Sequence, residues 1–275
     1  MILPSRAQTG ITLYPNRVPN TISGVSIERN TPEFYFYKPE KQLNNKVFLI
    51  IPGGGYAVVA MNHEGHDVAK RLKDLGYASF VLRYRLPVDS QMIDKRIAPI
   101  QDAQNALAYI RNKSNALGIN VDDVVVMGFS AGGHLASTLS THFDTSYIGD
   151  VDLRVLRPDY SVLVYPVITM QEGVTHLGSK NNLIGPNFET SDVSRFSNEL
   201  NVDRRTPPAY IIHAKDDKAV PIKNALLYKE QLDKNGVSNK LYIFDKGGHG
   251  FGMYNKQQEG DWFSDMLDWL NTKNR

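Results

Sequence analysis

The sequence predicts an α/β fold in which helices cover both faces of a mainly parallel central sheet. Short runs rich in β-branched and aromatic residues alternate along the chain with amphipathic helical patterns. Some runs, such as residues 46–51 (KVFLII), are almost continuously apolar, which is typical of strands buried on both faces. Repeated strand–helix–strand order implies right-handed crossovers between parallel strands.

The expected elements follow in order along the chain. Residues 24–39 predict two strands with a turn at 30–32, which should form an antiparallel hairpin at one edge of the sheet. The other expected strands are 46–51, 78–86, 124–127, 162–168, 209–213 and 241–244. The expected helices are 63–75, 97–117, 131–142, 221–232 and 262–270. Residues 170–205 are less regular and predict either a loop or a small cap.

Length and composition indicate a single domain over residues 1–275, near the upper size for one hydrophobic core. Lys plus Arg is 31 and Asp plus Glu is 29, so the net charge of +2 gives no general attraction to nucleic acid or anionic membrane. The absence of cysteine excludes disulfides, thiolate catalysis and cysteine-ligated metals. The N-terminus lacks the features of a secretory signal, and no apolar run approaches the roughly 18 residues of a membrane span. We therefore expect a cytoplasmic protein without a nucleic-acid or membrane partner.

The strongest functional signal is the segment 128–133, GFSAGG, which lies between an expected buried strand and an expected helix. A nucleophile at such a turn sits in a strained backbone with its side chain exposed to substrate. The glycines two residues before and two residues after Ser130 leave room for the neighbouring strands. The helix that begins at Ala131 directs its positive end at the reaction centre. The five-residue pattern also occurs by chance, but the flanking strand and helix favour Ser130 as a nucleophile.

A second signal is the segment 52–56, PGGGY, which directly follows a buried strand. Three glycines allow backbone N–H groups to approach a ligand closely. In an ester hydrolase these groups would face the oxyanion of the tetrahedral intermediate, together with the N–H of Ala131. A phosphate-binding loop is the alternative, but the spacings typical of nucleotide-binding glycine loops are absent.

The order of residues points to a base and an acid. Serine hydrolases with this type of turn carry serine, then acid, then histidine along the chain. His249 is the only one of the seven histidines after residue 217, and it lies in a glycine-rich loop past the last expected strand. Asp216 and Asp217 both follow the strand 209–213, and the residues alone do not separate them. Asp245 is a weaker candidate because only three residues separate it from His249.

Four segments together resemble the α/β-hydrolase fold esterases: 52–56 (PGGGY), 128–134 (GFSAGGH), 213–221 (HAKDDKAVP) and 247–251 (GGHGF). The chain is most similar to acetylxylan-esterase-like and hormone-sensitive-lipase-like carboxylesterases, over roughly residues 45–255. The Asp-x-x-Val-Pro pattern of that family matches this chain from Asp217 onward, so the resemblance favours Asp217 over Asp216. It also places the oxyanion donors at Gly54 and Gly55. Lipase-like members usually carry histidine where this chain has Pro52, and their large N-terminal cap has no counterpart here.

The resemblance implies a serine esterase that hydrolyses short-chain carboxylic esters through an acyl-enzyme, with acetylated carbohydrates among the candidate substrates. Ser130, Asp217 and His249 would be catalytic, Gly54, Gly55 and Ala131 would form the oxyanion hole, and no cofactor or metal would be needed. A serine peptidase or amidase of the same fold and a non-catalytic binding module remain as alternatives. The expected partner is a small ester, and a homodimer is also considered.

Several other polar and aromatic residues are expected to be structural. Residues 63–66 (HEGH) lack the spacing of a zinc helix, and Glu64 and Gly65 match a step common after the glycine loop of these esterases without an evident role. His134 should be a packed or capping residue rather than a ligand. For Trp262, Phe263 and Trp269, packing is favoured over a dimer contact.

Overall fold

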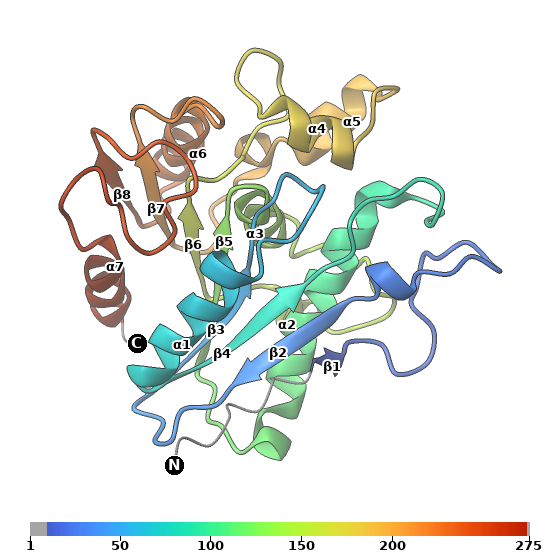
Figure 1. Ribbon diagram of the computed structural model, residues 1–275, viewed down its shortest axis with the longest axis horizontal. Coiled ribbons are helices and arrows are strands. Elements are labelled where there is room, and N and C mark those ends of the chain that lie inside the picture. Colours follow the sequence, from blue (N-terminus) through green and yellow to red (C-terminus); the bar gives the residue numbers. More distant parts are fainter. Residues whose placement is uncertain (1–9, 274–275) are drawn as a thin grey trace.

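The computed structural model describes residues 10–273, and these build one eight-stranded sheet with the order β1-β2-β4-β3-β5-β6-β7-β8 (Figure 1). Strand β1 pairs antiparallel with β2, and β2 pairs antiparallel with β4, whereas all other pairs are parallel. The mainly parallel sheet is therefore confirmed. The strands are β1 (Ile11–Thr12), β2 (Glu33–Tyr37), β3 (Asn44–Ile51), β4 (Tyr77–Arg83), β5 (Asp123–Phe129), β6 (Tyr160–Val164), β7 (Ala209–Ala214) and β8 (Asn239–Phe244).

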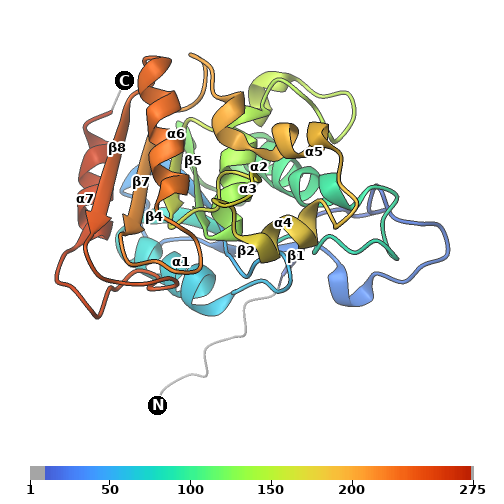
Figure 2. The same cartoon turned by 90° about the horizontal axis from the view of Figure 1, so that it is seen from above.

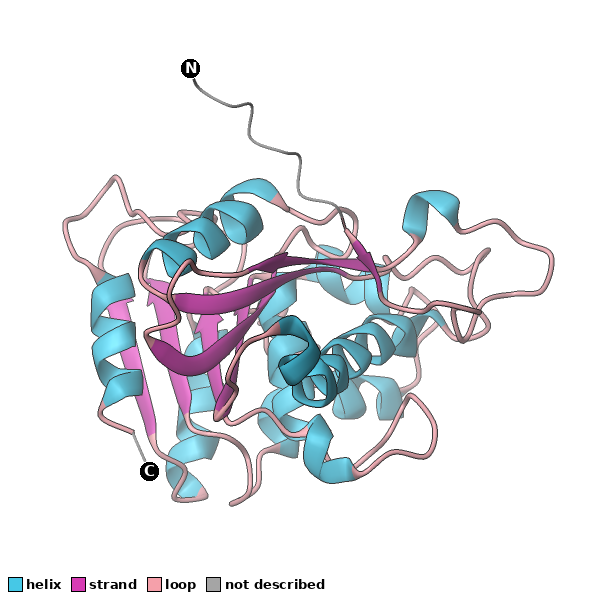
Figure 3. Ribbon diagram, turned by 90° about the horizontal axis from the view of Figure 1, so that it is seen from below, coloured by secondary structure: helices cyan, strands magenta, loops and turns pink. Residues whose placement is uncertain are grey.

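Helices cover both faces of this sheet, as predicted (Figures 2 and 3). One core cluster contains side chains of α2 (Ala98–Leu117), α3 (Ala131–Thr141) and α6 (Lys223–Lys234). The other contains side chains of α1 (Asp67–Asp74) and α7 (Trp262–Asn271). The two clusters lie on opposite faces because successive side chains of a strand alternate. In β3, for example, Val47 and Leu49 belong to the first cluster and Phe48 and Ile50 to the second.

The predicted hairpin in residues 24–39 is wrong. Residues 24–27 lie outside the strands, and residues 28–30 form a 3-10 turn, η1 (Glu28–Asn30). The cause is the side chain of Asn30, which accepts from the Leu86 N–H at 2.7 Å and donates to the Leu86 carbonyl at 2.9 Å and to Gln91 Oε1 at 2.8 Å. These bonds attach the segment to the loop after β4, so β2 pairs with β1 and β4 instead.

Strand β6 also differs from its predicted extent of 162–168. It ends at Val164, because Tyr165 adopts a positive φ of 36° that turns the chain away from the sheet. The N–H of Val167 then donates to the carbonyl of Ser130 at 3.0 Å. The chain that leaves β6 is thereby held beside the end of β5.

Residues 170–205, called the cap segment below, contain two short helices and a 3-10 turn. These are α4 (Leu177–Leu183), α5 (Thr190–Phe196) and η5 (Asn198–Asn201). The two helices lie beyond the carboxyl ends of the central strands, at the top of Figure 1. Ligands of parallel sheets bind at this edge, so the cap segment covers the side of the sheet where a site is expected.

Candidate active site

The turn that carries Ser130 joins β5 directly to α3. Ser130 has φ 51° and ψ −117°, a combination that typically costs about 1–3 kcal/mol for a residue with a side chain. The neighbouring backbone leaves no space for side chains at the two flanking glycines. A Cβ on Gly128 would collide with the carbonyl of Gly132, and one on Gly132 would collide with the carbonyl of Ile51. The two glycines are therefore required by close backbone approach, as the motif predicts.

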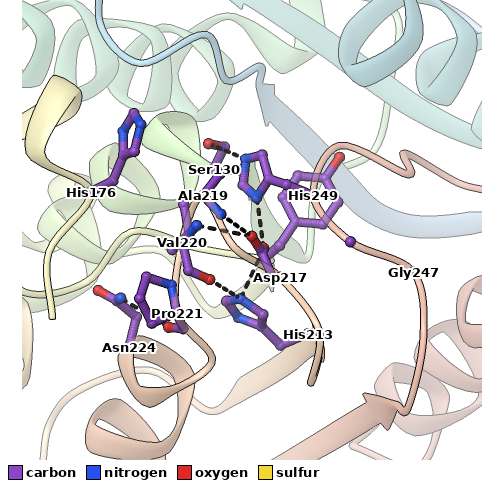
Figure 4. Close-up of polar contacts among 12 residues, drawn as sticks. Ser130, His176, His213, Asp217, Ala219, Val220, Pro221, Asn224, Gly247 and His249 are labelled. Carbon is purple, nitrogen blue, oxygen red and sulfur yellow. Dashed lines mark hydrogen bonds and ion pairs between the residues drawn. The ribbon is translucent and has the colours of Figure 1, made fainter.

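Three side chains from three strand ends meet at this turn (Figure 4). The Oγ of Ser130 lies 2.8 Å from Nε2 of His249, and Nδ1 of His249 lies 2.7 Å from Oδ2 of Asp217. Ser130 follows β5, Asp217 follows β7 and His249 follows β8. Because parallel strands end at one edge, residues that are up to 119 positions apart come within hydrogen-bonding distance. A carboxylate that accepts from Nδ1–H leaves Nε2 free to accept the serine proton.

The carboxylate of Asp217 is buried and receives several hydrogen bonds. The N–H groups of Ala219 and Val220 both donate to Oδ1 at 2.9 Å, and Nε2 of His213 lies 3.2 Å from Oδ2. Burial by itself raises the pKa of this carboxyl. The hydrogen bonds from His213 and His249 outweigh burial and hold the pKa of Asp217 well below its usual range. Asp217 is therefore ionised at neutral pH.

Asp216, the other sequence candidate for the acid of the site, makes no hydrogen bond with His249 and lies in a different position. Its side chain is exposed, and Oδ1 accepts from the N–H of Gly247 at 2.9 Å and from that of Gly248 at 2.8 Å. It thus anchors the backbone of the loop that carries His249. The two neighbouring aspartates therefore have separate roles, since Asp217 contacts the imidazole and Asp216 contacts the loop.

The glycine loop after β3 comes within contact distance of the serine turn. A Cβ on Gly53 would lie 2.8 Å from Cβ of Ser130, and one on Gly54 would collide with the carbonyl of Val58. Gly54 and Gly55 have φ values of 121° and 67°, which side chains rarely tolerate. The N–H groups of Ala57 and Val58 donate to the carbonyl of Gly54 at 3.1 Å each and fold the loop back on itself. Ala131 begins α3, and the first N–H groups of a helix have no partner within it.

Comparison with known proteins places this site in a family. Residues 34–232 match the family model BD-FAE. The chain belongs to the BD-FAE family. The match includes the glycine loop, Ser130 and Asp217 and ends before His249. The BD-FAE chain and an acetylxylan esterase from Xylanibacter ruminicola are 35% identical over 238 residues, which are 82% of this chain and 45% of that protein. The BD-FAE chain therefore spans less than half the length of this relative.

Solved structures give the same result for the fold. The BD-FAE chain aligns with an acetyl ester-xyloside bifunctional hydrolase from Caldicellulosiruptor lactoaceticus at a TM-score of 0.84 and 35% identity, over 96% of both chains. It aligns with MGS-M1, an α/β hydrolase from a deep-sea metagenome library, at a TM-score of 0.69 and 28% identity, over 97% of both chains. The predicted α/β-hydrolase fold and the resemblance to esterases are confirmed.

Glu64 connects two loops of the BD-FAE site in a way that no motif predicted. A π-helical turn, η2 (Asn62–His66), places this buried carboxylate under the glycine loop, where Oε2 accepts from the N–H of Gly53 at 2.8 Å. The hydroxyl of Tyr165 donates to Oε1 at 2.6 Å and accepts from the N–H of Gly252 at 3.1 Å. The Tyr165 ring also lies edge-on to the His249 ring, with centroids 4.8 Å apart. Glu64 and Tyr165 therefore hold the glycine loop and the histidine loop in a fixed relation.

His134, which was expected to be packed, connects α3 to the glycine loop and to α5 of the cap segment. Its two ring nitrogens lie 2.8 Å from the hydroxyl of Tyr56 and 2.8 Å from the carbonyl of Phe196. Complete burial lowers the pKa of His134 to about 4, so the ring is neutral. The cap segment is further attached by Asn182, whose amide donates to the carbonyl of Gly55 at 2.8 Å.

The remaining expectations concern metals, membranes and the C-terminal aromatic residues. Within residues 10–273, no cluster of three or more histidine, aspartate or glutamate side chains is arranged to hold a metal ion. Over the same range, no helix combines the length and apolar character needed to cross a membrane. Trp262 and Phe263 belong to α7 and are buried in the core, and Trp269 of the same helix packs against the same cluster.

Proposed function

We propose that the protein is a serine esterase that removes short acyl groups, chiefly acetyl, from carbohydrate esters. One observation carries the reaction type: the continuous hydrogen-bonded chain Ser130–His249–Asp217, with separations of 2.8 and 2.7 Å, beside a glycine loop at the nucleophile. The names of two similar proteins, an acetylxylan esterase and an acetyl ester-xyloside hydrolase, support the substrate class.

In the first step, Nε2 of His249 accepts the proton of the Ser130 hydroxyl while Oγ attacks the carbonyl carbon of the ester. The carbonyl oxygen becomes an oxyanion, which the N–H groups of Gly54, Gly55 and Ala131 stabilise. The C–O bond to the alcohol then breaks, and His249 gives its proton to the departing alkoxide oxygen. The products are a free alcohol and an acyl group on Ser130.

In the second step, His249 takes a proton from a water molecule as that water attacks the acyl-enzyme. A second oxyanion forms in the same place and collapses, the bond to Oγ breaks, and the proton returns to Ser130. The ionised Asp217 keeps the proton of His249 on Nδ1 and stabilises the imidazolium. Each oxyanion donor typically contributes about 100- to 1000-fold to kcat.

A series of 4-nitrophenyl esters from acetate to long chains tests the acyl preference. We expect kcat/KM to be highest for acetate or butyrate and to fall at least about tenfold for long chains, since one methylene that does not fit costs about 1–3 kcal/mol. The assay measures release of 4-nitrophenolate, with enzyme-free hydrolysis of each ester subtracted. Faster turnover of long-chain esters than of acetate would contradict the preference for short acyl groups.

The alternatives predict other results in the same assays. A serine peptidase or amidase of this fold would release the chromophore rapidly from a dipeptide anilide. A binding module would hydrolyse neither. The cytoplasmic location stays a prediction, and the homodimer stays an alternative under consideration.

A further inference from the structure

His176 forms the start of helix α4 in the cap segment, and its hydrogen bonds define which nitrogen carries the proton in the neutral ring. It is the N-cap residue of the helix, and Nδ1 accepts from the N–H of Ser179 at 3.2 Å. The hydroxyl of Ser179 lies 2.8 Å from the same nitrogen. A backbone N–H can only donate, so Nδ1 has no proton in the neutral ring. The proton of neutral His176 is therefore on Nε2.

The ring that carries this Nε2–H group lies next to the glycine loop. A Cβ on Gly55 would be 3.7 Å from Cε1 of His176, so the ring is next to the glycine loop. Asn182, in the same helix, fixes this arrangement through its bond to the carbonyl of Gly55. In Figure 4, Ser130 lies between His176 and the imidazole of His249. Among residues 10–273, Nε2 of His176 has no hydrogen-bond partner.

The ring stays in its neutral form around pH 7. Partial burial lowers the pKa of His176, and the electrostatic influence of the nearby His249 lowers it further, against a smaller opposite effect of Asp217. A neutral imidazole whose Nδ1 is occupied offers one N–H donor with a defined direction.

We propose that the Nε2–H of His176 donates a hydrogen bond to an oxygen of the sugar that carries the ester. This inference rests on the proposed function. An acetyl group offers one acceptor, its carbonyl oxygen, and that oxygen is held by the glycine loop and Ala131. The donor of His176 therefore needs a different oxygen, and the hydroxyl and ring oxygens of a sugar supply it. His176 would select hydroxylated alcohols over aromatic ones without taking part in bond making.

Two matched variants test the roles of the two ring nitrogens of His176 separately. In His176→Asn, the side-chain amide lies at about the distance of Nδ1 from the backbone. Asparagine is a favourable N-cap residue, so this variant retains the N-cap acceptor but loses the donor at the position of Nε2. In His176→Gln, the amide lies at about the distance of Nε2, so it retains the outer donor and loses the cap. The readout is the ratio of kcat/KM for a mono-O-acetylated methyl xyloside to kcat/KM for 4-nitrophenyl acetate.

We expect this ratio to fall about tenfold in His176→Asn and to stay within about threefold of the original in His176→Gln. A loss of folded protein lowers both rates equally and leaves the ratio unchanged, so the ratio remains informative for an unstable variant. An unchanged ratio in His176→Asn, or an equal fall in both variants, would overturn the proposal. Absence of hydrolysis of both esters by the unaltered protein would instead contradict the proposed function.

Discussion

Replacing Ser130 by alanine is expected to lower kcat for 4-nitrophenyl acetate by about 10⁶, the loss seen when the nucleophile of a serine hydrolase is removed. Without Oγ no acyl-enzyme forms, and the oxyanion donors alone give only the residual rate. The fold should persist, because the change removes one hydrogen bond, to His249 at 2.8 Å, and such a bond is worth about 0.5–1.5 kcal/mol. Steady-state kinetics and thermal unfolding of the same preparation measure both effects.

Ser140→Ala provides the matched control for this change. Ser140 lies in α3, the helix that follows Ser130, and is also buried, but its hydroxyl donates to the carbonyl of Ala136, at 2.9 Å, and not to His249. We expect Ser140→Ala to keep kcat within a few-fold of the original. If Ser130→Ala retained more than about a hundredth of the activity, Ser130 would not be the nucleophile.

Asp217→Asn should lower kcat by about 10⁴. An amide group in this position cannot stabilise a positively charged imidazole. It also cannot accept every bond that Asp217 now accepts, from Ala219 and Val220 on one side and from His213 and His249 on the other. The result would be a wrong tautomer or a displaced ring at His249. The kcat for 4-nitrophenyl acetate measures the effect.

The variant Asp216→Asn tests whether the loss of kcat depends on which of the two neighbouring aspartates loses its charge. Its amide oxygen can still accept from the N–H groups of Gly247 and Gly248, and the side chain is exposed. We expect a loss of tenfold or less. Similar losses in Asp216→Asn and Asp217→Asn would mean that the acid of the site is not assigned correctly.

The parts of the site that local sequence determines could be predicted. The turn at Ser130 is specified by consecutive residues, since Gly128 and Gly132 are the positions where a side chain would meet backbone. Strand and helix periods on either side placed that turn at the carboxyl edge of the sheet. His249 followed from the order of residues along the chain.

What the sequence did not reveal depends on contacts between distant residues. Only the resemblance to esterases favoured Asp217 over Asp216; the residues alone did not, because the two differ in their bonds to a loop 31 and 32 positions away. The role of Glu64 depends on Tyr165, which is 101 positions away, and the wrong hairpin reflects bonds of Asn30 to residues 56 and 61 positions away. No local pattern contains such partners, because they are brought together only by the complete fold.

The central claim is that His249 activates Ser130 as a nucleophile. Incubation of the unaltered protein with a fluorophosphonate, followed by digestion and mass spectrometry, tests it directly. We predict one added phosphonyl group, on the peptide and the side chain of Ser130, together with loss of ester hydrolysis in proportion to labelling. An unlabelled Ser130, or labelling of a different residue with the same loss of activity, would contradict the account.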